Sequence, residues 1–193
     1  MRNANTSFDK HKLNKNKKKY TSDSEQSETE EESSKKIIIH KTFLKDIADT
    51  LSSIVSQNKN SKNQNTAFSH GHIPKISLFE YLLRIQKYSG IENSTIIIAL
   101  IYIDRICIKK GITLTRYNIH RILFTSVLIS IKYNEDIIYD YLYYSKIGGI
   151  TPAELSKLEN GFLKMIGFEL FVSEEVYNKY YSYLNSDDNT NND

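Results

Sequence analysis

The chain has 193 residues, of which 39% are hydrophobic and 25% charged, the proportions of an ordinary globular domain. Its single cysteine excludes an intrachain disulfide, and the scarcity of Gly and Pro (7 and 2 residues) disfavours a turn-rich all-β fold. The longest uncharged apolar run, Asn93 to Ile103, is shorter than the roughly 20 residues that span a bilayer. The polar start shows no signal-peptide pattern, so we expect an intracellular protein, nuclear or cytoplasmic, without a membrane segment.

The formal net charge of +3 is unevenly distributed along the chain. Residues 1–20 hold seven Lys or Arg and one Asp, whereas residues 21–34 hold six Asp or Glu and no base. Residues 1–36 also lack an apolar period, which predicts a disordered charged tail. The basic run at 15–19 leaves open a nuclear import signal or a nucleic-acid arm, although a solvated tail is the simpler interpretation.

Apolar side chains recur at helical spacing from Ile37 to Val55, so residues 37–56 are predicted to form an amphipathic helix. The Asn/Ser/Lys-rich stretch 57–72 is predicted to be a flexible linker, and the Asn/Asp-rich residues 185–193 a second disordered tail. Between them, residues 73–184 form the predicted main domain, which is long enough to bury one hydrophobic core.

Five helices are predicted within this main domain. The second and third are apolar on nearly all sides, which is typical of central helices in a bundle. The fourth has the clearest start, because Thr151 can cap it, Pro152 takes its first position and Glu154 follows three residues after the cap. The Tyr-rich loop before it leaves room for a short helix around Tyr139 to Ser145. The five predicted ranges are 76–89, 93–110, 118–135, 151–167 and 173–184.

Charged side chains at apolar positions mark a candidate site. Glu159 falls within the apolar stripe of the fourth helix, where an unpaired buried carboxylate would cost on the order of several kcal/mol. Either a cation of the domain, such as Lys132, meets it, or the stripe is exposed and binds a protein partner, and periodicity leaves both open. The second helix carries Asp104 and Arg105 after a long apolar run, and we expect a structural salt bridge there, with Arg84 as the partner of Asp104.

The residue types that carry catalysis are missing in the necessary patterns. The sequence contains no Gly-rich phosphate loop, no metal-spaced set of Cys and His and no pair of catalytic acids. His70 and His72 flank Gly71, but two ligands without a third do not make a metal site. Cys107 fits a small core residue on an apolar helix. We therefore expect no enzyme activity, no cofactor and no metal.

Three short motifs follow one another along the main domain: Tyr-Ile-Asp-Arg-Ile at 102–106, Ser-Ile-Lys-Tyr-Asn-Glu at 130–135, and Leu-Glu at 158–159 followed by Leu163 and Phe-Glu-Leu at 168–170. In this order they resemble the cyclin box of the cyclin family. The His-Arg pair at 120–121 and the Gly-Gly pair at 148–149 resemble the single-box P/U-type cyclins, also known as phosphate-system cyclins.

The resemblance implies an all-α fold, a five-helix cyclin box with an extra N-terminal helix. It also implies a non-catalytic subunit that binds and activates a cyclin-dependent protein kinase as a heterodimer, in division, phosphate response or transcription. In the family, the lysine and glutamate that match Lys132 and Glu159 face the kinase's mobile αC helix. The implied kinase-interface residues are Lys132, Tyr133, Glu159, Leu163, Phe168 and Leu170.

The alternative is a cyclin-fold transcription factor or nucleic-acid-binding module. The main domain is nearly neutral, which disfavours strong contact with phosphates and makes a nucleic-acid partner the weaker expectation.

Overall fold

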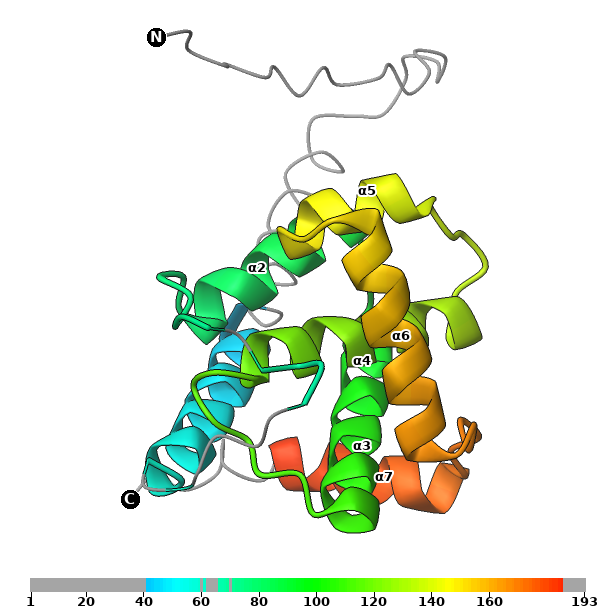
Figure 1. The fold of residues 1–193 in the computed structure, drawn as a ribbon. Helices are drawn as coiled ribbons and strands as arrows, with labels where there is room; N and C mark the ends of the chain where they lie inside the picture. The colour runs from blue at the N-terminus through cyan, green and yellow to red at the C-terminus, as the bar shows by residue number, and fades with distance from the viewer. Residues whose placement is uncertain (1–40, 60, 62–65, 70, 186–193) are drawn as a thin grey trace, which may run out of the picture. The chain divides into compact units, whose positions relative to one another are not determined.

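The computed structural model describes residues 41–59, 61, 66–69 and 71–185 (Figure 1). These all belong to the larger of two compact units, Ile37–Asp193, while the smaller unit, Met1–Lys36, lies outside the described residues. The predictions for the charged tail 1–36 and for residues 186–193 therefore stay predictions.

Helices account for all regular secondary structure in the described part of the chain. Residues 41–57 are helical, and the start predicted at residue 37 lies outside the described residues. The helices that follow are α2 (Leu78–Ser89), α3 (Asn93–Lys110), α4 (Ile119–Asn134), α5 (Tyr141–Gly148), α6 (Pro152–Ile166) and α7 (Glu174–Asn185). Five of them match the predicted ranges closely, and α5 is the short helix for which the Tyr-rich loop left room.

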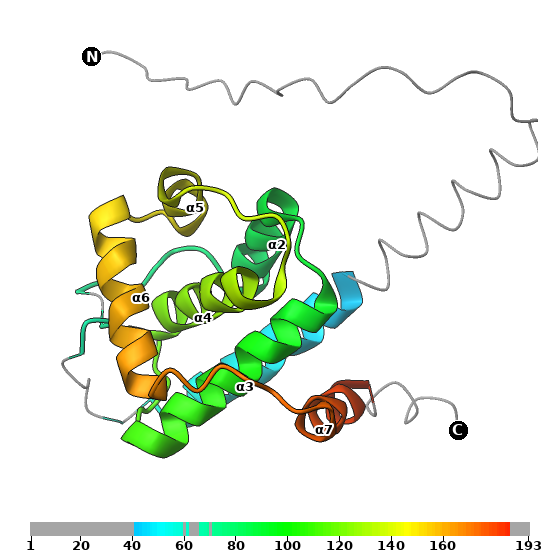
Figure 2. The same cartoon turned by 90° about the vertical axis from the view of Figure 1, so that its right-hand side faces the viewer.

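The centre of the fold is the pair α3 and α4, which pack against each other more extensively than any other pair among α2 to α7 (Figure 2). Two small polar residues of α4 help the helices to approach. Ser126 is buried and donates a hydrogen bond to the Ala99 carbonyl (2.5 Å), and Ser130 is buried and donates to the Thr95 carbonyl (2.8 Å). Because each hydroxyl is satisfied by the backbone of α3, burial of these polar groups costs little.

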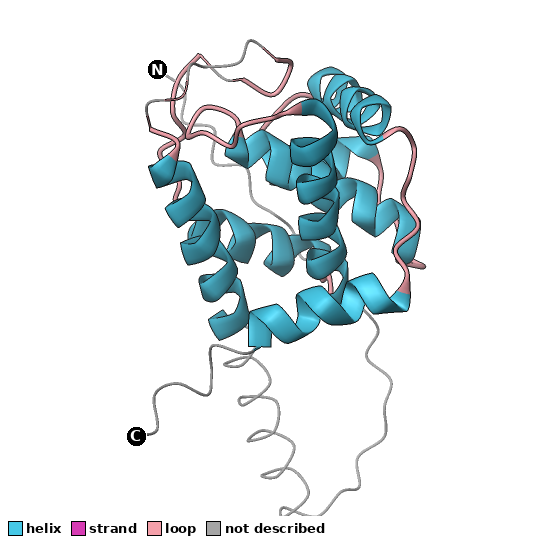
Figure 3. Cartoon of the chain, turned by 90° about the horizontal axis from the view of Figure 1, so that it is seen from below, coloured by secondary structure: helices cyan, strands magenta, loops and turns pink. Residues whose placement is uncertain are grey.

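The other helices surround this pair. Helix α6 packs on both α3 and α4, α7 packs on α3, and α5 packs on α2 and α6. Figure 3 shows these helices joined by loops, with no strand in the described part of the chain. The helix at 41–57 turns one apolar stripe inward and joins the same core through its buried residues Phe43, Leu44, Ile47, Ala48 and Leu51. No described helix combines the length and the hydropathy that crossing a bilayer would require.

Capping residues fix where α2 and α6 begin. The Thr151 hydroxyl accepts a hydrogen bond from the Glu154 amide (3.2 Å) and Pro152 occupies the first position, as the sequence predicts. At α2, Ser77 and Glu80 form a reciprocal capping box. The start of α6 is thus fixed locally, and its register places residue 159 opposite α4.

Candidate functional site

A partly buried ion pair joins the C-terminal end of α4 to the middle of α6. The Lys132 ammonium lies 2.8 Å from Oε1 and 3.0 Å from Oε2 of Glu159. The Glu159 side chain is 9% exposed and the Lys132 side chain 28%, so the pair sits where the core meets the surface. Buried Leu155 and Phe162 share the same stripe of α6. The cation that meets the carboxylate is therefore Lys132, one of the two possibilities that the periodicity left open.

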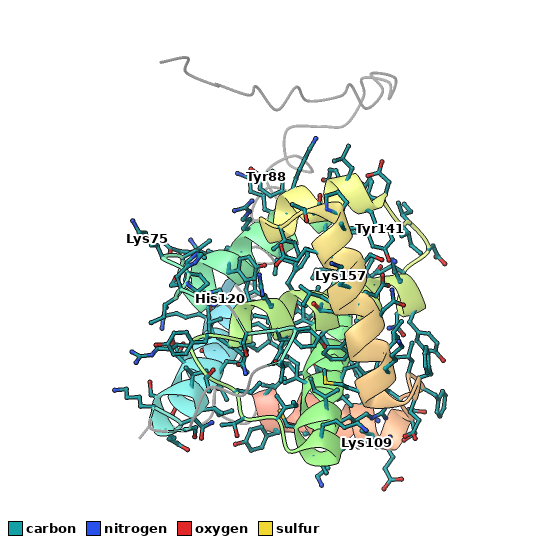
Figure 4. All side chains as sticks on the ribbon, in the orientation of Figure 1. Lys75, Tyr88, Lys109, His120, Tyr141 and Lys157 are labelled. Carbon is teal, nitrogen blue, oxygen red and sulfur yellow. The ribbon has the colours of Figure 1, made fainter. Side chains whose placement is uncertain are left out.

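Tyr141 completes this cluster, although the sequence does not single it out. Asp140 caps α5 by accepting a hydrogen bond from the Tyr143 amide (2.7 Å), which makes Tyr141 the first helical residue. The Tyr141 hydroxyl donates to Oε2 of Glu159 and accepts from the Lys132 ammonium (3.1 Å). The ammonium also lies 4.2 Å from the centre of the Tyr141 ring, within cation–π range. Figure 4 shows Tyr141 beside α6.

The protonation of the cluster follows from these contacts. Burial alone would lower the pKa of Lys132, but hydrogen bonds to Glu159 and Tyr141 outweigh it and raise that pKa above its ordinary value. Burial, together with the hydrogen bond to the Glu159 carboxylate, raises the pKa of Tyr141. Both groups therefore keep their protons at neutral pH and act as hydrogen-bond donors, not as proton-transfer groups.

The segment after α6 presents aromatic side chains next to this cluster. Phe168 follows Gly167 and is 66% exposed. Its own backbone lies in the left-handed region (φ 58°), and its amide donates a hydrogen bond to the Leu163 carbonyl (3.0 Å). Tyr133, one residue after Lys132, is 50% exposed. Leu163 and Leu170 are partly buried and pack against the core. The described residues thus place an apolar and aromatic surface around the ion pair.

Two side chains of α3 hold this segment in place through its backbone. Tyr102 donates its hydroxyl to the Leu170 carbonyl (2.7 Å). Arg105 donates to the carbonyls of Glu169 (2.7 Å) and Phe171 (2.9 Å). The Tyr-Ile-Asp-Arg motif therefore acts structurally, by anchoring the segment 168–171 against α3.

A shallow pocket joins the anchored segment to α4. Lys109 reaches the carboxylate of Glu169 (2.5 Å) and the Ile166 carbonyl (3.2 Å). The pocket measures about 490 Å³ and is open to the surface. Tyr133, Phe168 and Leu170, three of the predicted interface residues, meet in its wall; the full lining is Arg105, Lys109, Tyr133, Phe168, Glu169, Leu170 and Phe171.

Comparison with known proteins assigns the chain to a family. A family model described as Cyclin matches residues 6–170 of the chain. The chain belongs to the cyclin family. Cyclins are regulatory, non-catalytic proteins, and this one is of the P/U type, as its similarity to individual cyclins shows.

Plant and yeast cyclins are among the similar proteins. Cyclin-U4-1 of Arabidopsis thaliana is 37% identical over 126 residues, which cover 64% of this chain and 62% of that protein. Cyclin-U4-2 of the same plant is 42% identical over 120 residues, 62% of this chain and 56% of that protein. PHO85 cyclin-7 of Saccharomyces cerevisiae is 38% identical over 130 residues, 61% of this chain and 46% of that protein. The match thus spans less than two thirds of each relative's length.

The expected salt bridge between Arg84 and Asp104 does not form. In the described part of this cyclin, Arg84 donates to the Lys146 carbonyl of α5 (2.6 Å), and Asp104 accepts the hydroxyl of Tyr180 from α7. The two side chains point to different neighbours, because α2 packs on α5 while this face of α3 packs on α7. Helical periodicity shows which face a residue occupies, but not which helix covers it.

The sequence did not single out two residues of this region, Tyr141 and Phe171. Tyr141 depends on how the loop before α5 returns to α6, for which no sequence signal exists. Phe171, which is 73% exposed, lies in an irregular segment where no period applies. The sequence around Phe171 therefore carries no local signal that would have marked it.

Metal and redox chemistry find no support in the residues that the structure describes. No group of three His, Cys, Asp or Glu gathers among them, and His70 lies outside the described residues. Burial raises the pKa of Cys107 to about 11, so its thiol stays protonated and unreactive.

Proposed function

We propose that this cyclin binds a cyclin-dependent protein kinase and activates it by docking on the kinase's αC helix. The observation that carries the proposal is the ion pair of Lys132 with Glu159, whose carboxylate is nearly buried while exposed apolar side chains occupy the neighbouring segments. Monomeric proteins rarely expose such a patch without a binding role. The name PHO85 cyclin-7 pairs a yeast relative with PHO85, which supports a protein partner of the same kind here.

The exposed side chains lie on both sides of the ion pair. Ile137 (73% exposed) lies between α4 and α5, Leu142 (55%) lies in the first turn of α5, and Phe168 and Phe171 follow α6. Both segments lie along one side of the fold, at the right of Figure 1, and Figure 2 shows this side face on. A helix laid across this side would bury apolar surface at two places and meet the charged pair between them, which is the common anatomy of a protein interface.

The mechanism we infer is allosteric. A protein kinase positions ATP only when its β3 lysine pairs with the glutamate of αC. A protein that binds the inward position of αC more tightly than the outward one shifts the kinase population toward the active state. In this proposal Lys132 and Glu159 fix the αC backbone, and Tyr133, Leu163, Phe168 and Leu170 pack against its apolar side.

Affinity purification of the tagged chain, followed by mass spectrometry, identifies the kinase. The double variant Lys132→Ala/Glu159→Gln is then compared with wild type in binding and in kinase activity. We expect binding to weaken by about tenfold or more, since both charged hydrogen-bonding groups are lost from the interface. Kinase activity at a fixed concentration of the cyclin should fall together with the binding affinity.

The matched control is Lys157→Ala. Lys157 is an exposed lysine on the same helix α6, so its loss changes the charge without touching the ion pair (Figure 4). Circular dichroism of every variant checks that it is folded. The proposal fails if the double variant binds and activates the kinase as well as wild type does. Tight, salt-sensitive DNA binding instead of kinase binding would favour the nucleic-acid alternative.

A further inference from the structure

The carboxylate at the centre of the proposed docking site is already occupied in the free chain. An ionised carboxylate offers about four lone-pair positions to hydrogen-bond donors. Lys132 contacts both oxygens of Glu159, and the Tyr141 hydroxyl takes a further position on Oε2. With the Glu159 side chain only 9% exposed, little acceptor capacity remains for a partner. Both positions on Oε2 are filled, so one of the two internal donors must give way before a partner can hydrogen-bond to this oxygen.

Tyr141 is the donor that can move at least cost. Lys132 comes from α4, whose residues from Ile122 to Ile131 are all buried, and it supplies the charge that keeps Glu159 stable in a nearly dry position. Tyr141 is the first residue of an eight-residue helix and is itself 36% exposed. Its side chain can rotate outward without unwinding α5, because Asp140 caps the helix through the Tyr143 amide.

The residues just before Tyr141 also favour this movement. Ile137 and Ile138 are 73% and 48% exposed, and they precede the first turn of α5 by a few residues. Because these two side chains are largely free of the core, a partner that covers them also reaches Tyr141 and can displace its side chain.

We infer that Tyr141 is a gate on the docking site. In the free chain its hydroxyl fills the position on Oε2 of Glu159 that a hydrogen-bond donor of the partner takes in the complex. This inference rests on the proposed kinase docking and adds to it a residue that sets the affinity. It also defines the chemistry of the partner group, an N–H or O–H donor that replaces a phenol.

Tyr141→Phe tests the gate most sharply, because it removes the hydroxyl and keeps the ring over Lys132. Without the hydroxyl the docking-competent state becomes the larger fraction of the free chain, and apparent affinity rises with that fraction. We expect the kinase to bind about threefold to tenfold more tightly, with a faster association rate and an unchanged dissociation rate. Surface-based kinetics with the full chain and the co-purified kinase measure both rates.

The matched control is Tyr139→Phe. Tyr139 is exposed to a similar degree, and its ring packs on Tyr143 with centroids 4.4 Å apart. This substitution removes a hydroxyl from the same loop without touching Glu159, so both rates should stay at the wild-type values.

The outcomes separate the gate from the docking site itself. If Tyr141→Phe binds as wild type does or more weakly, while Lys132→Ala/Glu159→Gln still loses binding, the gate is wrong and the docking site stands. If Tyr139→Phe strengthens binding as much as Tyr141→Phe, the gate is also wrong, because loss of any hydroxyl in the loop would have the same effect. If wild type and all variants bind alike, or none binds, both proposals fall together.

Discussion

A single carboxylate at an apolar position is the most informative residue of this chain. The Glu159 side chain is 9% exposed, and its charge is tolerated because Lys132 and Tyr141 both reach it. Removing only the cation would leave an anion in a site that water scarcely reaches. Removing cation and anion together would leave no charge to solvate. The two kinds of substitution should therefore differ in their effect on stability.

Lys132→Met tests this difference. We expect the free energy of unfolding to fall by about 1–3 kcal/mol, between the values for exposed and buried pairs, because Lys132 is itself partly exposed. Adding Glu159→Gln should restore part of that loss. Urea unfolding followed by circular dichroism measures each variant. If Lys132→Met and Lys132→Met/Glu159→Gln were equally stable, the Glu159 carboxylate would have to be solvated by water once Lys132 is gone.

At this scale the sequence predicted the anomaly and named its partner, but not the whole cluster. Helical periodicity placed Glu159 on an apolar stripe and offered Lys132 as a cation. Tyr141 could not be predicted, because its position depends on how an irregular loop returns to the surface of α6. The pairing of Arg84 with Asp104 failed for a related reason, since periodicity does not show which helices are neighbours.

At the scale of elements, α5 is held by tertiary packing more than by its own sequence. Its last residue, Gly148, lies against the ring of Phe124 in α4, and the Gly148 carbonyl accepts the hydroxyl of Tyr81 from α2 (3.1 Å). Phe124 is buried and packs on Tyr81, with ring centroids 6.2 Å apart. Glycine is therefore required here by the closeness of α4, not by an unusual backbone angle.

Gly148→Ala should expose this dependence. The added methyl group would overlap the Phe124 ring, which has no room to withdraw, so we expect a loss of about 1–3 kcal/mol in the free energy of unfolding. Gly71→Ala is the control, because open space surrounds Gly71 and its change should stay within about 0.5 kcal/mol. Thermal unfolding of the two variants compares them directly. Equal melting temperatures would mean that α5 moves away from α4 freely.

Helices α2 and α6 each carry two independent local signals. Helix α6 has a capping sequence as well as an apolar stripe, and α2 has its own capping box. Helix α5 has eight residues, too few for a helical period to be distinguished from chance. The exposed segment after Gly167 has no period at all, so its anchoring by α3 became visible only in three dimensions.

For the molecule as a whole, buried phenols make stability depend on alkaline pH. Burial raises the pKa of Tyr102 to about 12 and also raises the pKa of Tyr81 and Tyr144. Below pH 10, the ordinary tyrosine pKa, folded and unfolded chains both keep these protons. Between about pH 10 and 12 the unfolded chain loses them and the folded chain does not, so stability falls as pH rises. Lys132, whose pKa is also raised, adds to the loss in the same direction.

The free energy of unfolding should therefore decline above pH 10. Tyr102 alone would contribute about 2 kcal/mol of the difference between pH 9 and pH 12. Tyr102→Phe, compared with wild type in urea at each pH, should have a lower stability near neutrality, because it lacks the hydrogen bond to Leu170, but a shallower alkaline decline. If the free energy of unfolding fell equally steeply above pH 10 in wild type and in Tyr102→Phe, the alkaline decline would not come from Tyr102.

The way α3 holds the segment after α6 has a consequence for how this surface can diverge. Tyr102, Arg105 and Lys109 donate to main-chain carbonyls between Ile166 and Phe171, which every amino acid provides. The shape of the segment is thus largely independent of which side chains it carries. Substitutions at 169 and 171 can therefore change the side chains that this surface presents while the backbone of the segment keeps its shape. Such changes need no compensating substitution in the core.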